Sequence, residues 1–177
     1  MTRTNAFGQP IGRDLAGWRP PPRPEVDVLS GRWARVERLR ASHADELYDA
    51  LGGAANAALW TYSAQGPFTD RDAFAACVRQ RAEDPAAVAV AIDDGHGACA
   101  LASFLAIQGR HVFDLGYRRY EWKCDALNEP SRRAALRLGF TSYEGRFRNA
   151  TTYKGRSRDT DWFSITDLRT NEAVAVR

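Results

Sequence analysis

Residues 117–140, YRRYEWKCDALNEPSRRAALRLGF, carry the pattern that decides the fold of this chain. In their first half apolar and charged side chains alternate, and strict alternation with a period of two predicts a half-buried β-strand. The apolar face of this strand consists of Tyr120, Trp122, Cys124 and Ala126. The face expected to meet solvent consists of Arg119, Glu121, Lys123 and Asp125.

The second half of the stretch predicts a helix that starts at Asn128. Asparagine is a strong N-cap, Glu129 complements the helix dipole, and Pro130 is tolerated in the first turn. Gly139 and Phe140 end the helix as a C-cap followed by an apolar anchor. The whole stretch therefore predicts a strand–helix unit.

The start of this helix is the best candidate for a ligand site. A helix N-terminus offers free backbone N–H groups and a partial positive charge, and Ser131 adds a hydroxyl in the first turn. Arg133 lies on the same helix and could reach a phosphate. Asn128 and Ser131 are also ordinary residues for a helix start, so the residues alone leave both interpretations open.

Strands are expected on both sides of this unit. Before it, two apolar runs at 86–92 and 98–107 flank a Gly-rich turn, which predicts a hairpin. After it, residues 143–147, 150–153 and 161–167 are strand-like, and the last two segments predict another hairpin.

Two helices are expected before the first hairpin. One has Ser42 as its N-cap and ends at Gly52, and the other follows the N-cap Thr69 and stops at Asp84. Residues 26–40 predict an extended segment that is broken by a turn.

The chain is expected to form one domain behind an N-terminal arm. Residues 1–24 are rich in Pro, Gly and Arg, and prolines lack the backbone donor that helices and central strands need, so this part predicts an extended arm. Residues 25–177 mix strands and helices in an order that fits a single α/β (α+β) domain. A length of 177 residues agrees with one domain.

The composition excludes several classes of protein. Hydrophobic residues make up 44% and charged residues 27%, which fits a globular chain and not a disordered or fibrous one. Lys and Arg exceed Asp and Glu by 25 to 22, but no groove-reading motif accompanies the excess, which argues against nucleic-acid binding as the main function. An Arg-rich RNA-associated module stays open as the weaker alternative.

No metal or disulfide site is expected. The cysteines Cys77, Cys99 and Cys124 are odd in number and widely spaced, and the histidines are scattered. Neither a signal-peptide core nor a membrane-spanning run is visible, which predicts a soluble, cytoplasmic protein.

One combination of motifs resembles a known family. Asn128 and Ser131, followed by LGF at 138–140 and EG at 144–145, resemble the terminal motif of the GNAT N-acetyltransferases. The match is closest to the RimJ/RimL-like branch, which contains ribosomal-protein-alanine acetyltransferases and relatives with other amine substrates. The strand at 117–125 fits the strand before that motif, and the resemblance extends over most of the chain.

The resemblance implies a fold, a reaction and a set of site residues. The fold would be a mixed, mostly antiparallel central sheet flanked by helices. The reaction would transfer the acetyl group of acetyl-CoA to an amine acceptor, either a peptide N-terminus or a small molecule, without a metal. Asn128 and Ser131 would contact the cofactor, together with Arg133, and Ser131 could protonate the departing sulfur. The chain would act as a monomer or a homodimer.

The sequence departs from the family where the cofactor phosphates should bind. The loop Gln/Arg-x-x-Gly-x-Gly/Ala is missing, and only residues 108–116, a short helical pattern, separate the second apolar run from the strand near Tyr117. A parallel crossover needs about a dozen residues or more. We therefore infer an internal deletion of this loop and of one or two central strands.

Catalytic groups of the family are missing as well. Ala135 stands near the place of the tyrosine that many members use as an acid, and no carboxylate stands at Ala150 or Thr151. Glu121 and Asp125 remain as candidate bases, although a solvated strand face explains both. Two hypotheses follow: an active N-acetyltransferase, or an impaired, truncated domain with weak or no acetyl-CoA binding.

Overall fold

The computed structural model describes residues 3–12, 15–22, 27–104 and 113–167. The strands of this part are β1 (Arg3–Thr4), β2 (Pro10–Ile11), β3 (Val28–Ser30), β4 (Arg35–Arg38), β5 (Val88–Asp93), β6 (Ala98–Phe104), β7 (Arg119–Asp125), β8 (Ser142–Tyr153) and β9 (Arg156–Thr166). The helices are η1 (Ala41–His43), α1 (Ala44–Leu51), η2 (Ala54–Trp60), α2 (Arg71–Glu83) and α4 (Glu129–Arg137), where η denotes a 3₁₀ helix.

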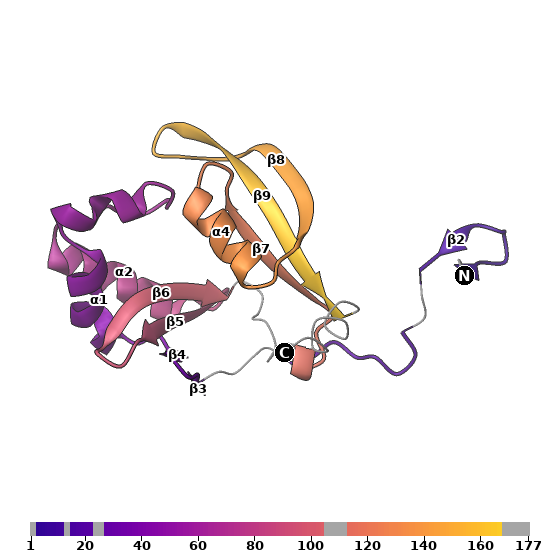
Figure 1. Cartoon of the computed structure of the whole chain (residues 1–177), viewed down its shortest axis with the longest axis horizontal. Coiled ribbons are helices and arrows are strands. Elements are labelled where there is room, and N and C mark those ends of the chain that lie inside the picture. The colour runs from indigo at the N-terminus through magenta and orange to yellow at the C-terminus, as the bar shows by residue number, and fades with distance from the viewer. Residues whose placement is uncertain (1–2, 13–14, 23–26, 105–112, 168–177) are drawn as a thin grey trace.

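The described strands form separate antiparallel sheets. One has the order β3-β4-β5-β6, another the order β7-β9-β8, and β1 and β2 pair by themselves. Helices α1 and α2 lie against the first of these sheets and α4 against the second (Figure 1). The prediction of an α/β (α+β) fold with mostly antiparallel strands flanked by helices is confirmed. Among the described residues, no strand joins β6 to β7 by backbone hydrogen bonds.

Both predicted hairpins are confirmed. β5 and β6 pair from Val88 with Phe104 to Asp93 with Ala98, and the Asp93 side chain accepts hydrogen bonds from the turn amides of Gly95 and Gly97. β8 and β9 are longer than the expected segments, since β8 runs without interruption through two bulges. A bulge disrupts the ladder only locally, which lets two short strand-like segments form one strand.

The two early helices start close to the predicted residues. Asp70, and not Thr69, caps α2, because its carboxylate accepts a hydrogen bond from the Ala73 amide at 2.7 Å. Ser42 lies inside the turn η1 instead of capping α1, which begins at Ala44. Both predictions are wrong only in the position of the cap.

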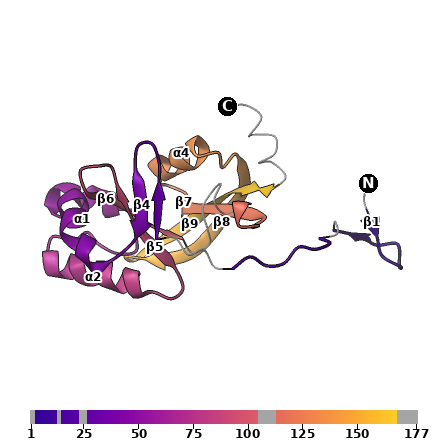
Figure 2. The same cartoon turned by 90° about the horizontal axis from the view of Figure 1, so that it is seen from below.

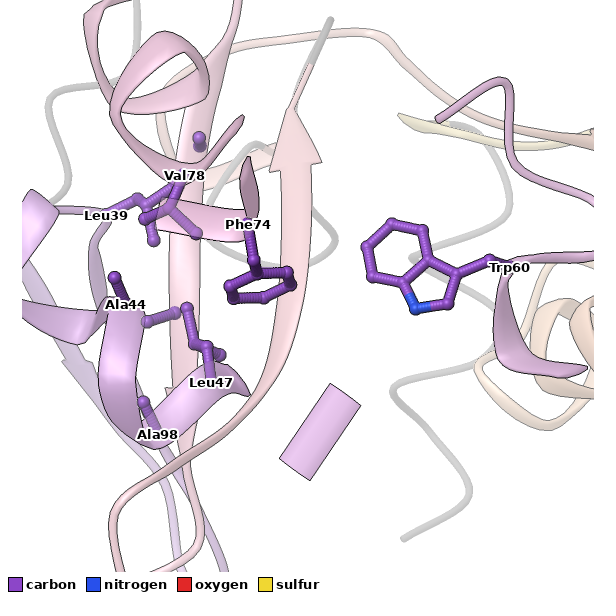
Figure 3. Close-up of a cluster of buried hydrophobic side chains, with 9 residues drawn as sticks. Leu39, Ala44, Leu47, Trp60, Phe74, Val78 and Ala98 are labelled. Atoms are coloured by element: carbon purple, nitrogen blue, oxygen red, sulfur yellow. The ribbon is translucent and has the colours of Figure 1, made fainter. Parts of the chain in front are cut away.

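The main core lies between the first sheet and its helices. Phe74 of α2 sits at its centre, with Leu47 and Val78 on one side and Trp60 on the other (Figure 3). The rings of Tyr48 and Phe68 meet Phe74 edge to face at 5.6 and 5.4 Å. Aromatic contacts therefore join the aliphatic side chains of this core in holding α1, η2 and α2 against one face of the sheet.

A second core and a polar junction complete the body. Under α4, Phe140 and Ala135 pack against Cys124 and Phe163. At the junction the Lys154 ammonium, in the turn between β8 and β9, donates to the carbonyl oxygen of Trp60 at 2.9 Å and to that of Gln65 at 3.1 Å. The tip of this hairpin is thereby tied to the segment that contains η2.

The described N-terminal residues, 3–12 and 15–22, extend away from the body (Figures 1 and 2). A short hairpin of β1 and β2 lies within them, which the sequence did not predict. Trp18 donates its indole N–H to the Gly116 carbonyl, and Tyr117 donates its hydroxyl to the Pro22 carbonyl.

The division into an arm at 1–24 and a domain at 25–177 stays a prediction. Most of the short helical pattern at 108–116 lies outside the described residues.

Among the described helices, none has the length and apolar character needed to cross a membrane.

Candidate functional site

Strand β7 leads into α4 through a tight turn. The Asn128 amide donates to the Asp125 carbonyl at 2.9 Å, and the Asn128 side chain accepts a hydrogen bond from the Ser131 amide at 3.1 Å. The prediction that Asn128 caps the helix is confirmed. The same turn places Asn128 and Ser131 next to each other at the helix start.

The backbone donors of this helix start are already used. The Glu129 amide donates to the Leu127 carbonyl, the Arg132 amide donates to the Asn128 carbonyl, and Pro130 has no N–H. The Ser131 amide is bound by the cap. The expectation of free N–H groups here is therefore wrong, because the cap and turn satisfy them locally. A ligand would meet side chains and the helix dipole instead.

Ser131 lies half-buried between α4 and β7. Its hydroxyl oxygen accepts a hydrogen bond from the Trp122 indole N–H at 3.1 Å, which leaves the hydroxyl proton to be donated. The neighbouring thiol is that of Cys124, whose pKa is raised by burial, while the hydrogen bond with Ser131 acts in the opposite direction. Burial has the larger effect, so the pKa of Cys124 lies above its ordinary value despite the neighbouring Ser131 hydroxyl.

The arginines of the first helical turns differ in their availability. The Arg132 guanidinium lies 3.5 Å from the Glu129 carboxylate and 3.2 Å from the Asp161 carboxylate. Arg133 is exposed and makes no ion pair with another described residue. The positive charge of Arg133 would therefore be available to bind a ligand phosphate.

The two candidate bases are both engaged. Glu121 pairs with the Arg119 guanidinium at 2.6 Å. Asp125 is only 5% exposed, and it accepts hydrogen bonds from the Tyr153 hydroxyl at 2.6 Å and the Leu127 amide at 2.9 Å. The expectation of a solvated Asp125 is wrong, because the far end of β8 covers this end of the strand.

Sequence reasoning missed a third carboxylate. Asp161 on β9 is completely buried, and the Arg146 guanidinium donates two hydrogen bonds to it, at 2.7 and 3.0 Å. Arg146 is the main cause that lowers the pKa of Asp161 below its ordinary value. The alternation of residues 156–166 places Asp161 on the α4 side of the sheet. No sequence signal identified the partners of this carboxylate.

Tyr120 offers a test of the packing beneath α4. Burial raises its pKa to about 12, above the value of about 10 for an exposed tyrosine. Between these values the unfolded chain loses the proton and the folded chain keeps it, so the free energy of unfolding should fall as the pH rises from about 10 to about 12. Urea unfolding over this range should show a shallower decline for Tyr120→Phe than for the unmodified chain. Equal declines would contradict the assigned burial.

A cavity of about 740 Å³ lies elsewhere, near the end of α2. Its lining includes Gln65, Arg81 and Ser103, but none of Asn128, Ser131 and Arg133. The predicted site residues therefore lie outside this cavity. No cluster of metal-ligating side chains occurs among the described residues.

Solved structures resemble this chain along most of its length. A GCN5-related N-acetyltransferase from Brucella melitensis is 34% identical, with a TM-score of 0.79, over 87% of this chain and 85% of that one. A probable acetyltransferase of the GNAT family from Chromobacterium violaceum is 26% identical, with a TM-score of 0.80, over 92% of this chain and 98% of that one.

A more distant match concerns the fold alone. RimL, a ribosomal L7/L12 α-N-protein acetyltransferase solved with coenzyme A, is 17% identical, with a TM-score of 0.56, over 80% of this chain and 98% of that one. No protein-family model matches the sequence, and a search of the curated proteins found no match.

Proposed function

The chain belongs to the GNAT family of N-acetyltransferases, and we propose that it transfers the acetyl group of acetyl-CoA to an amine. Membership makes it an acyltransferase. The cofactor, the acceptor and the site residues are our proposal, and so is its place in the RimJ/RimL-like branch. Acceptors would be peptide N-termini or small-molecule amines, and the protein would act in the cytoplasm as a monomer or homodimer.

In the proposed reaction a neutral amine attacks the thioester carbonyl carbon of acetyl-CoA. The C–N bond forms and the C–S bond breaks, the amine nitrogen gives a proton to a base, and the departing thiolate takes up a proton. Ser131 would supply that proton to the sulfur. Asn128 would contact the cofactor, and Arg133 would bind one of its phosphates.

The observation that carries this proposal is the setting of the Ser131 hydroxyl. Because Trp122 donates to its oxygen at 3.1 Å, the hydroxyl is oriented and its own proton is left for another acceptor. A donor held in this way costs little reorganisation when charge develops on a leaving sulfur.

A second candidate function is an impaired GNAT domain that binds acetyl-CoA weakly or not at all. Two observations favour it: β6 and β7 lie in separate sheets among the described residues, and the first-turn amides of α4 are already bonded. The first of these agrees with the internal deletion that we infer from the short connection at 108–116. Such a domain would lack the phosphate-binding loop that holds the pyrophosphate through backbone amides.

Calorimetric titration of the full chain with acetyl-CoA separates the two functions. Measurable heat of binding, together with thiol release in the presence of an amine or a short peptide, supports the transferase. A flat titration supports the impaired domain.

Replacing Ser131 tests its role as the acid. Ser131→Ala should lower the rate of thiol release about 100-fold, because it removes a positioned proton donor. The Kd of acetyl-CoA should change little. An unchanged rate would show that another group protonates the sulfur.

Asn128 needs a pair of variants, because it is also a helix cap. Asn128→Ala should cost about 1 kcal/mol of stability through the lost cap, and it should raise the Kd of acetyl-CoA about tenfold if a hydrogen bond to the cofactor is lost. Asn128→Asp keeps the cap but replaces the amide N–H donor. Weaker binding in both variants would indicate direct contact, whereas weaker binding in Asn128→Ala alone would indicate an effect through the cap.

A further inference from the structure

A buried carboxylate lies at the middle of the three-stranded sheet. Asp161 of β9 is 0% exposed, and its register partners are Cys124 on β7 and Arg146 on β8. A charge removed from water is costly unless cations and hydrogen-bond donors compensate it. The cations and donors that compensate the negative charge of Asp161 therefore identify the elements to which this carboxylate is bound.

These groups come from two different elements. β8 provides the Arg146 guanidinium, with two hydrogen bonds, and the Tyr143 hydroxyl at 3.2 Å. α4 provides Arg132, whose Nε lies 3.2 Å from Asp161 Oδ2 as an ion pair without hydrogen-bond geometry. Asp161 thus ties both the neighbouring strand and the first turn of α4 to β9.

The tie to α4 acts together with a second one. Ser131 is bound to Trp122 on β7, and the next residue, Arg132, is paired with Asp161 on β9. Consecutive helical residues point about 100° apart, so contacts to two adjacent strands restrict rotation of the helix about its axis. The apolar contacts of Ala135 hold the helix against the sheet but are not directional.

We propose that Asp161 is a positioning residue for the acetyl-CoA site, because through Arg132 it fixes the rotation of α4. That rotation determines where Ser131 and Arg133 point. The proposal rests on the proposed function, since it assigns to Asp161 the orientation of the groups that would bind and protonate the cofactor. Asp161 itself does not touch the cofactor.

The experiment compares acetyl-CoA binding and amide hydrogen exchange in single variants of the full chain. Asp161→Asn and Arg132→Gln should each raise the Kd about tenfold and speed exchange in the first turn of α4. Arg132→Lys keeps a positive charge within reach of Asp161 and should recover most of the affinity. Arg148→Gln, an exposed arginine on β8 outside this cluster, is the matched control and should change neither quantity.

A merely structural role predicts a different result. It would lower the Tm of Asp161→Asn but leave the Kd unchanged well below that temperature, and Arg132→Lys would rescue nothing. Unchanged Kd values in Asp161→Asn and Arg132→Gln would overturn the proposal. Tighter binding of acetyl-CoA by Asp161→Asn would also overturn the proposal. It would mean that Asp161 only neutralises the positive charge of Arg132 and does not position the helix. No binding by the unmodified chain would instead defeat the proposed function, and hydrogen exchange would still decide whether Asp161 holds the helix.

Discussion

Phe74→Ala is expected to lower the free energy of unfolding by about 3–5 kcal/mol. The ring is 1% exposed and meets the rings of Tyr48, Trp60 and Phe68, so its removal leaves a cavity that three aromatic neighbours cannot fill without leaving their edge-to-face arrangement. Urea unfolding measures the loss as a lower midpoint with an unchanged m value.

The control for this prediction is a phenylalanine with no core role. Phe7 is 86% exposed, and Phe7→Ala should change the free energy of unfolding by no more than about 0.5 kcal/mol. A loss below about 1 kcal/mol for Phe74→Ala would mean that the aromatic cluster does not hold α1, η2 and α2 against the sheet.

Asp161→Ala should cost about 3 kcal/mol of stability, because it leaves two arginines beside an empty buried position. Arg146 and Arg132 are 39% and 36% exposed, so water can rehydrate them in part. The loss of stability should therefore lie at the lower end of the range for removing one partner of a buried ion pair. Chemical unfolding at low and high salt measures the effect. Because Asp161 is buried, added salt should change it little.

An exposed aspartate in an ion pair provides the comparison. Asp45 is 93% exposed and lies 3.6 Å from the Arg71 guanidinium. Asp45→Ala should cost at most about 1 kcal/mol, and that loss should shrink at high salt. Equal losses for Asp45→Ala and Asp161→Ala would contradict the assigned burial of Asp161.

Local patterns predicted most of the fold. The alternation at 119–125 and the cap at Asn128 gave β7 and α4, because period-two burial and capping depend on neighbouring residues only. The Gly-rich turn between β5 and β6 predicted their hairpin for the same reason. Cap positions were wrong by a residue or two where several polar residues compete for one role, as Thr69 and Asp70 do.

The partners of the carboxylates were not predictable in this way. Asp125 occupies a position of the alternating pattern that should face solvent, but Tyr153 approaches it from a strand 28 residues away. Arg146 reaches Asp161 across a bulged register, and a bulge changes which side chains share a face.

The sequence by itself determined the strand–helix unit at 117–140, the hairpins and the resemblance in the Asn128–Ser131 motif, since each depends on residues close together in the chain. Only the tertiary structure decided that Asp125 is buried and that Asp161 links α4 to two strands. These features depend on which distant side chains meet across the sheet. That is set by strand register and packing, which local patterns do not specify.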